Sequence, residues 1–358
     1  MSNQRVQTVR GPVTPDKLGR TLPHEHLRSD FTHLYRRPPK YIADEFTEFK
    51  LEKTGYYRQW PYSSKSNLDL KNLDNDVLCR DISIFKKYGG GTIVENSSEG
   101  LDRSLSDFMR ISRITDVNIV AGTGFYTADT QSYDLLNGST EELYNHMLKE
   151  LSVGFSVQYY GARQTYTCTY KAGFVGEIAS SWPLKDFEVR AIKAAGELQP
   201  TVGCGVSCHP HCVAAAPFEV ARLYLEAGGK ADKLVVSHLD RSLLDTQKLL
   251  EFSELGVYCE IDNFGNEGSF DQINEGLDIP YDTQRIDQIK ALVAEGKEDR
   301  ILMSHDIHSR HRLVEYGGHG FSHIINNIFP RMKAKGIPQV TIDKITMENP
   351  ARWLTIEE

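Results

Sequence analysis

Two histidines stand one residue apart near the start of the sequence, in the stretch TLPHEHL of residues 21–27. Residues i and i+2 of an extended strand point to the same face, so His24 and His26 would lie side by side while Glu25 points away. Two imidazoles placed in this way can bind one metal ion. A polar strand end without a ligand would show the same spacing, so the pair needs partners elsewhere in the chain.

Four more ionisable side chains stand at the ends of other short apolar, β-rich runs. Taken singly, each could instead cap a strand, bond to a carbonyl group or begin a turn. Together they supply further imidazole and carboxylate donors, a mixture that favours zinc and tolerates manganese, cobalt or iron. We therefore predict a metal centre whose ligands are His24, His26, Glu177, His209, His238 and Asp306.

The elements that would position these residues alternate regularly along the chain. Eight short apolar runs predict strands at residues 19–26, 90–98, 117–126, 173–181, 202–210, 233–240, 256–264 and 300–307. Segments with 3.6-residue periodicity predict helices at residues 75–89, 104–116, 140–154, 185–199, 217–229, 243–256 and 283–297. This alternation indicates an α/β fold, a (β/α)8 TIM barrel with its active site at the C-terminal ends of the strands. The rival, an open doubly wound sheet, would want a glycine-rich turn after the first strand, and LPHEHLRS is not one.

Closure of such a barrel would gather the ligands into two groups. The first and eighth strands become neighbours, so the two histidines of the first strand would converge with Asp306 on one ion. The fourth, fifth and sixth strands are consecutive, which would bring Glu177, His209 and His238 to a second ion. Glu177 could bridge the pair, and two ions about 3.5–4 Å apart would hold a hydroxide between them. Asp306 is the expected catalytic residue, because it could accept the proton of the attacking water and pass it to the leaving group.

The composition is that of an ordinary globular protein, with 358 residues, 40% of them hydrophobic and 25% charged. A net charge of −8 without any basic tract argues against a nucleic-acid partner. No stretch has the length of a signal peptide or a membrane span, so we expect a cytoplasmic protein without a membrane partner. The six cysteines lack C-x-x-C spacing and should be free thiols.

We expect one barrel domain over residues 1–358, with a loop-rich, aromatic excursion at about residues 27–70 that lies over the barrel mouth. Barrels of α and β units often use this many residues in a single domain. The sequence leaves the oligomeric state open, with a homodimer among the states it allows.

Longer motifs extend the pattern across the chain: TLPHEH, GFVGEIASSWPL, SHLDR, SHDIHSRHRL and YGGHGFSHI. Together they resemble the phosphotriesterase family of the amidohydrolase superfamily, from about residue 6 to ENPARWLT at residues 348–355. The resemblance implies that the six predicted ligands occupy the metal-ligand positions of the family. Bacterial phosphotriesterases bridge their metals with a carboxylated lysine, whereas here Glu177 stands one place beyond the ungapped match. Lys171 is the nearby lysine, and we expect it at the other end of the strand.

The expected reaction is hydrolysis of a small molecule by a metal-bridging hydroxide. Two divalent ions, less the charges of two carboxylates and a hydroxide, leave a centre of about +1, which favours an anionic substrate. Arg241, His308 and Arg310 follow the ligand strands and could bind its anionic end, or could instead brace loops. Asn96 and Tyr126 could line the pocket, with core packing as the alternative for the tyrosine ring.

Family members that resemble this chain act on amides of small acids, which implies N-acetyltaurine as the substrate, cleaved to taurine and acetate. One alternative is an esterase, lactonase or phosphoester hydrolase that uses the same site. Another is a metal-binding scaffold without turnover. The complete ligand set argues against the scaffold, because a site out of use would be expected to lose a ligand.

Overall fold

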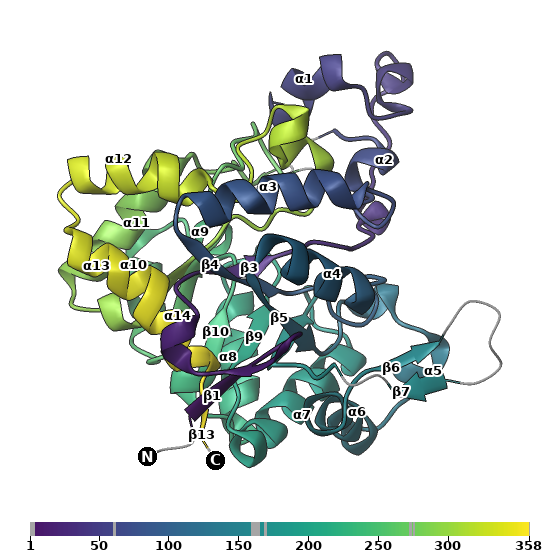
Figure 1. Cartoon of the computed structure of the whole chain (residues 1–358), viewed down its shortest axis with the longest axis vertical. Coiled ribbons are helices and arrows are strands. Elements are labelled where there is room, and N and C mark those ends of the chain that lie inside the picture. The colour runs from purple at the N-terminus through teal and green to yellow at the C-terminus, as the bar shows by residue number, and fades with distance from the viewer. Residues whose placement is uncertain are drawn as a thin grey trace.

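Eight parallel strands form the centre of the computed structural model, which describes residues 4–59, 62–158, 165–167, 170–271, 274 and 276–357 (Figure 1). Neighbours in the sheet follow the order of the chain, and each predicted run contains one strand. The sheet closes where the backbone N–H of Asp306 donates to the carbonyl of His24 at 3.2 Å. The (β/α)8 prediction is confirmed. The strands are β3 Arg20–Glu25, β4 Gly90–Glu95, β5 Asn118–Thr123, β8 Phe174–Ala179, β9 Val206–His209, β10 Leu234–Val236, β11 Tyr258–Ile261 and β12 Ile301–Met303.

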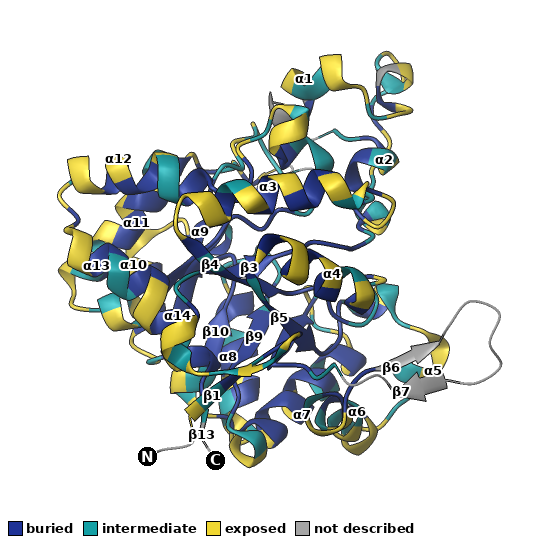
Figure 2. Ribbon diagram, in the orientation of Figure 1, coloured by how far each residue is buried: buried dark blue, intermediate teal, exposed yellow. Residues whose placement is uncertain are grey.

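Helices cover the outside of the barrel and turn one face to it and the other to solvent (Figure 2). Local sequence sets their starts: at α6 the Ser139 hydroxyl accepts from the Glu142 N–H, while the Glu142 carboxylate accepts from the Ser139 N–H. The seven predicted helices are α3 Asn75–Lys87, α4 Leu105–Thr115, α6 Thr140–Ser152, α7 Asp186–Val202, α8 Ala216–Glu226, α10 Thr246–Ser253 and α11 Asp282–Ala294. Helices outside the prediction are α1 Thr54–Gln59, α2 Lys65–Leu68, α5 Tyr133–Leu136, α9 Leu239–Ser242, α12 Phe329–Ala334, α13 Gln339–Asp343 and α14 Asn349–Leu354.

The N-terminal end of the barrel is closed by the two ends of the chain. The strands β1 Gln4–Thr8, β2 Gly11–Val13 and β13 Ile356–Glu357 form a small antiparallel sheet there, so the termini lie together in Figure 1. Trp353 of α14 is fully buried, with its ring centroid 5.5 Å from that of Phe174. Gly205 is required beneath this ring, because a Cβ there would lie 2.4 Å from Trp353 Nε1. The predicted ligands lie at the opposite, C-terminal end of the barrel.

The excursion at residues 27–70 joins the loop that follows β12. Asn67 Oδ1 accepts from the His311 N–H at 2.9 Å, and the side chains of the same residues lie 2.8 Å apart. Residues 60–61 of the excursion lie outside the described residues. In Figure 1 its helices α1 and α2 stand at the upper right, beyond the barrel. A second insertion is the hairpin of β6 Ser156–Gln158 and β7 Thr165–Thr167, between α6 and β8.

Five cysteines are free thiols: Cys79, Cys204, Cys208, Cys212 and Cys259. Cys168 lies outside the described residues. Within the described part of the chain, no helix combines the length and the apolar character that crossing a bilayer requires.

Candidate metal centre

The six predicted ligands meet at the C-terminal end of the barrel. They come from strand ends or the residues just beyond: His24 and His26 at β3, Glu177 in β8, His209 in β9, His238 after β10 and Asp306 after β12. His238 and Asp306 have left-handed backbone, with φ of 59° and 54°. Residues other than glycine rarely adopt this conformation, and such strain concentrates at functional sites. The left-handed backbone directs the side chain of His238, after β10, and that of Asp306, after β12, into the cage.

Three donors form the first half of the cage. His26 Nε2 lies 3.3 Å from Asp306 Oδ1, and His24 Nε2 lies 3.9 Å from the same oxygen. Donors about 2.0–2.2 Å from a tetrahedral zinc ion are separated by about 3.3–3.6 Å, so this triangle is close to the size that such an ion needs. All three side chains are buried.

The second half lies across the carboxylate of Glu177. His209 Nδ1 is 2.8 Å from Glu177 Oε2 and 3.1 Å from His238 Nε2. The other carboxylate oxygen, Oε1, lies 3.6 Å from His26 Nε2 on the first half. Glu177 therefore lies between the two halves: Oε1 faces the first half, and Oε2 lies between His209 of the second half and His24 of the first, a position that suits a bridging ligand. The prediction that these side chains come together agrees with the geometry, and their role as ligands remains a prediction.

Two buried polar atoms in the cage have the chemistry of cation ligands. In the described part of the chain, neither His24 Nε2 nor Glu177 Oε1 has a hydrogen-bond partner. His24 Nε2 lies 3.3 Å from Glu177 Oε2, but too poorly aligned for a hydrogen bond. Leaving such atoms unpaired in a buried site is costly, and a divalent cation would satisfy both. This set of imidazole and carboxylate donors therefore fits a divalent cation such as zinc.

Partners outside the cage fix the orientation of three imidazoles. His24 Nδ1 donates to Glu260 Oε2 at 3.1 Å, and His238 Nδ1 donates to Asp262 Oδ1 at 2.9 Å. His26 Nδ1 donates to Ser97 Oγ at 2.9 Å. Each contact makes Nδ1 the nitrogen that donates outside the cage and turns Nε2 toward the centre.

The Ser97 hydroxyl in turn donates to Oε1 of the buried Glu95 side chain at 2.6 Å. Burial raises the pKa of Glu95 to about 8, although hydrogen bonds from Ser97 and from the Leu27 N–H partly offset this. Glu25 points away from the cage, as predicted: it accepts from Ser304 Oγ at 2.8 Å and from His305 Nδ1 at 2.7 Å. The carboxylate between the two histidines therefore anchors the loop after β12.

Neighbouring charges and burial set the protonation states of the cage residues. Burial opposes ionisation of Glu177, but His209 and His24 outweigh it and hold the pKa of this carboxyl below its usual range. Burial would lower the pKa of His24, yet the neighbouring Glu177 and Glu260 raise it well above its usual value. Burial, with Arg241 and His209 nearby, lowers the pKa of His238, so this imidazole is neutral and offers a lone pair.

Two of the predicted substrate contacts have other roles in the structure. Asn96 is fully buried, and its amide donates to the carbonyls of Pro23 and Val94 at 2.9 and 3.2 Å. Arg310 donates through Nε and Nη2 to the carbonyl of Asp69. Backbone carbonyls accept from these donors, so in the structure the two side chains brace the strand β3 and the excursion, and their role as substrate contacts remains a prediction.

The other predicted contacts lie beside the cage. His308 Nδ1 is 2.8 Å from the carbonyl and 3.3 Å from the carboxylate of Asp306. Arg241 Nη2 donates to His209 Nε2 at 3.1 Å. The ring of Tyr126 packs edge-on against His209, with centroids 5.5 Å apart, and belongs to a small apolar cluster with Phe31.

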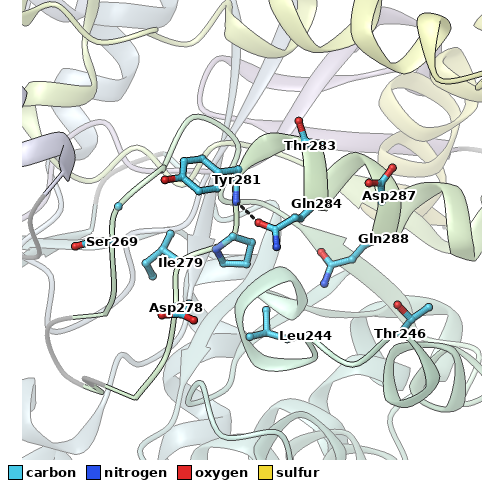
Figure 3. A pocket seen from close by; sticks show the side chains of 12 residues that line it. Leu244, Thr246, Ser269, Asp278, Ile279, Tyr281, Thr283, Gln284, Asp287 and Gln288 are labelled. Carbon is cyan, nitrogen blue, oxygen red and sulfur yellow. Dashed lines mark hydrogen bonds between the residues drawn. The ribbon is translucent and has the colours of Figure 1, made fainter.

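A small cavity lies beside the cage, next to two side chains that contact cage residues. Its volume is about 180 Å³, and its lining includes Leu34 and Tyr57 of the excursion together with Arg241, Asn263 and His308. A separate groove of about 870 Å³ lies at the start of α11, where Gln284 Oε1 accepts from the Tyr281 N–H (Figure 3). The six cage residues are absent from the lining of both spaces, but the smaller one is lined by Arg241 and His308, which contact the cage. The smaller cavity is therefore the candidate substrate site.

The sequence reasoning missed the residues that hold the cage histidines in place, above all Glu260 and Asp262 of β11 and its end. A signal was present, because two acids in i and i+2 positions within the apolar run VYCEID must share one face of a buried strand. Lys171 precedes β8 and lies at the opposite end of the barrel, as expected, beside Arg5 and Ile356. It cannot replace Glu177 as the bridge.

Comparison with known proteins places this site in a family. A model of the Phosphotriesterase family matches residues 4–354. The chain belongs to this family. It is 48% identical over 353 residues to the phosphotriesterase-related protein of Drosophila ananassae, with 98% of each chain covered. The family assignment supports a metal-dependent hydrolase with a histidine and carboxylate cluster that could bind metal.

Solved structures agree on the architecture. The resiniferatoxin-binding protein of Rhodobacter sphaeroides superposes with a TM-score of 0.89 at 26% identity, covering 98% of this chain and 94% of that chain. The lactonase Lmo2620 of Listeria monocytogenes superposes with a TM-score of 0.76 at 22% identity, covering 99% of this chain and 100% of that chain. At that identity the second comparison shows the fold alone.

Proposed function

We propose that this chain hydrolyses the amide bond of small N-acetylated compounds that carry an anionic group, with N-acetyltaurine foremost and taurine and acetate as products. The observation that carries the proposal is the placement of Glu177 between the two halves of the cage, with Oε1 3.6 Å from His26 and Oε2 2.8 Å from His209. His24 and His26 with Asp306 would hold one divalent cation, and the remaining two histidines a second, zinc being the ion that this donor set favours.

When bound, two such cations would make a water acidic enough to attack at neutral pH and would polarise the carbonyl of the substrate. Asp306 is the group placed to move a proton. His308, His26 and His238 outweigh burial and lower the pKa of Asp306 well below its usual value, so the carboxylate is ionised and can accept the proton of the attacking water. It would then deliver this proton to the amide nitrogen that leaves.

The surroundings of the cage suit a compact acyl group. Phe31 packs edge-on against His26 with centroids 4.8 Å apart, and Tyr126 does the same against His209 at 5.5 Å. These rings form an apolar wall that excludes water from the reacting carbonyl. The cavity of about 180 Å³ is smaller than the roughly 300–1,000 Å³ common for ligand pockets, which favours a small substrate.

The test is release of acetate from N-acetyltaurine by purified protein loaded with zinc or manganese. The Asp306→Asn variant should lower kcat by about 100–10,000-fold, because it removes the proton acceptor. His24→Ala should abolish turnover through loss of bound cation. His319→Ala, an exposed histidine outside the cage, serves as the matched control and should leave turnover unchanged.

Two results would overturn the proposal. If N-acetyltaurine is inert while lactones, esters or aryl phosphates are hydrolysed, the amide assignment is wrong although the site is catalytic. If a broad substrate panel gives no turnover and the protein retains no cation, the scaffold alternative is favoured.

A further inference from the structure

Arg241 is the basic side chain of the mouth whose donors are least occupied. It lies on α9, three residues after His238, and lines the small cavity. Its Nη2 donates to His209 Nε2 at 3.1 Å, and its buried Nε has no hydrogen-bond partner in the described part of the chain. Arg312 lines the same cavity, but its Nη2 already donates to the carbonyls of Phe264 and His305 at 2.9 and 2.8 Å.

The contact between Arg241 and His209 depends on which ring nitrogen carries the proton. A guanidinium only donates, so His209 Nε2 must accept, and the ring proton then sits on Nδ1 and is donated to Glu177 Oε2 at 2.8 Å. His209 Nδ1 is also the atom that faces the cage. A cation held there needs the Nδ1 lone pair, which moves the proton of the neutral ring to Nε2.

That change takes away the acceptor of Arg241. With a proton on His209 Nε2, the Nη2 group of Arg241 faces another donor, and its Nε is already unpaired. A charged side chain with unsatisfied donors in a half-buried position is unfavourable, and an anion that accepts from Nε and Nη2 together would satisfy both. Burial opposes the charge of Arg241, but Asp271 and Asp306 outweigh it and raise its pKa, so the side chain stays cationic.

We infer that Arg241 binds the anionic group of the substrate and that loading of the metal centre releases it for this role. The inference rests on the proposed function. Only the His209 ring separates Arg241 from Glu177, so the anion must be joined to the scissile amide by a short linker. The planar fork of the guanidinium suits a sulfonate or carboxylate bound through two oxygens. Anion and cation binding should therefore strengthen one another.

A matched pair of substrates tests the role of Arg241 in turnover. N-acetylethanolamine carries a hydroxyl where N-acetyltaurine carries a sulfonate, with the same scissile amide. Arg241→Met should lower kcat/KM for N-acetyltaurine by about 30-fold or more, the loss expected for removing one partner of a charged pair. It should change kcat/KM for N-acetylethanolamine by less than about threefold, since that substrate offers no anion. Arg241→Lys, which keeps the charge without the fork, should restore part of the loss.

A binding experiment tests the same inference without turnover. Calorimetry with ethanesulfonate should show affinity at least about tenfold higher for zinc-loaded than for zinc-free protein, with most of this gain lost in Arg241→Met. If wild-type protein hydrolyses neither amide but this pattern holds, the proposed function fails while the anion site stands.

Three results would overturn the inference. Arg241→Met and wild type could bind ethanesulfonate equally well when zinc-loaded. The two substrates could lose the same factor in kcat/KM. Finally, zinc content measured by mass spectrometry could fall in both Arg241→Met and Arg241→Lys, which would show that Arg241 serves to position His209 instead.

Discussion

Three imidazoles of the cage, those of His24, His26 and His238, each have one nitrogen committed to an acceptor outside it. For His26 this partner is a hydroxyl, Ser97 Oγ, which in turn donates to Oε1 of the buried Glu95 side chain. A neutral imidazole has one proton, so an acceptor at Nδ1 decides that Nε2 is the donor to a cation. The orientation of these three imidazoles is therefore set by residues outside the cage, which would not contact a bound cation.

Ser97→Ala tests this at the scale of one residue. Without the hydroxyl, His26 loses the acceptor at Nδ1 and can rotate or change tautomer, so we expect zinc affinity to fall by about 10–100-fold. Competition with a chromogenic chelator measures the change. Ser112→Ala is the matched control, because Ser112 on α4 is equally buried but donates to the carbonyl of Val117, which follows that helix. Equal zinc affinity in Ser97→Ala and wild type would show that the hydroxyl does not position His26.

The loop after β12 is held to the barrel by a helix far away in sequence. The buried carboxylate of Asp81 on α3 accepts from the Val314 N–H at 2.8 Å and from the Phe321 N–H at 3.0 Å. Burial raises the pKa of Asp81 to about 6, with these hydrogen bonds partly offsetting the effect. The loop begins at Asp306 and carries His308, so Asp81 holds the far part of a loop whose start is held by Glu25.

Asp81→Asn should loosen this loop at neutral pH. One amide N–H of asparagine would face a backbone donor, which leaves a buried donor unpaired and should lower the free energy of unfolding by about 1–3 kcal/mol. Hydrogen exchange should show faster exchange at Val314 and Phe321. Asp76→Asn, an exposed position on the same helix, is the control. Unchanged protection at both amides would rule out Asp81 as the anchor.

Elements differ in how far the sequence reveals them. The eight barrel strands are predictable because a strand buried on both faces reads as a continuous apolar run. The helices α12 and α14 escape prediction because Pro330 and Pro350 interrupt their segments, although proline is tolerated in the first turn of a helix. The pairing of β1 with β13 joins Gln4 to Glu357, a contact that no local pattern announces.

The same distinction applies to the site. The six cage residues could be predicted because polar side chains at the ends of apolar strands share one rim of a barrel. The roles of Asn96 and Arg310 could not, because their acceptors are carbonyls of Pro23 and Asp69 that only the folded chain brings close. Residue type indicated a polar contact in each case, but the partner depends on tertiary structure.

At the scale of the whole molecule, a buried ion pair joins three segments: the loop before α4, the helix α6 and the strand β5. Arg103 Nη2 lies 2.9 Å from both carboxylate oxygens of Glu150 on α6, and Thr123 Oγ1 of β5 donates to the same carboxylate at 2.6 Å. Burial opposes ionisation of Glu150, but Arg103, His146 and Thr123 outweigh it and lower its pKa to about 2. The pair stabilises the folded chain only while the carboxylate is ionised.

Glu150→Gln should therefore destabilise the protein in a pH-dependent way. A pKa lowered from 4.5 to about 2 corresponds to about 3 kcal/mol of unfolding free energy at pH 7. This contribution is present above pH 4.5 and is lost as the pH falls toward 2, so the difference between variant and wild type should shrink over that range. Urea unfolding from pH 7 to pH 3 measures it. Glu141→Gln, exposed on the same helix, is the control. If the difference in unfolding free energy between Glu150→Gln and wild type does not vary with pH, the ion pair does not stabilise the protein in this way.

Anomalous diffraction at the zinc edge from crystals of zinc-loaded protein would show directly whether the cage holds two cations. We expect two peaks roughly 3.5–4 Å apart, on either side of Glu177. One should lie about 2.0–2.2 Å from the Nε2 atoms of His24 and His26, and the other at the same distance from His209 Nδ1 and His238 Nε2. The absence of any peak in the cage, or a single peak that Glu177 does not contact, would contradict a two-cation centre bridged by Glu177.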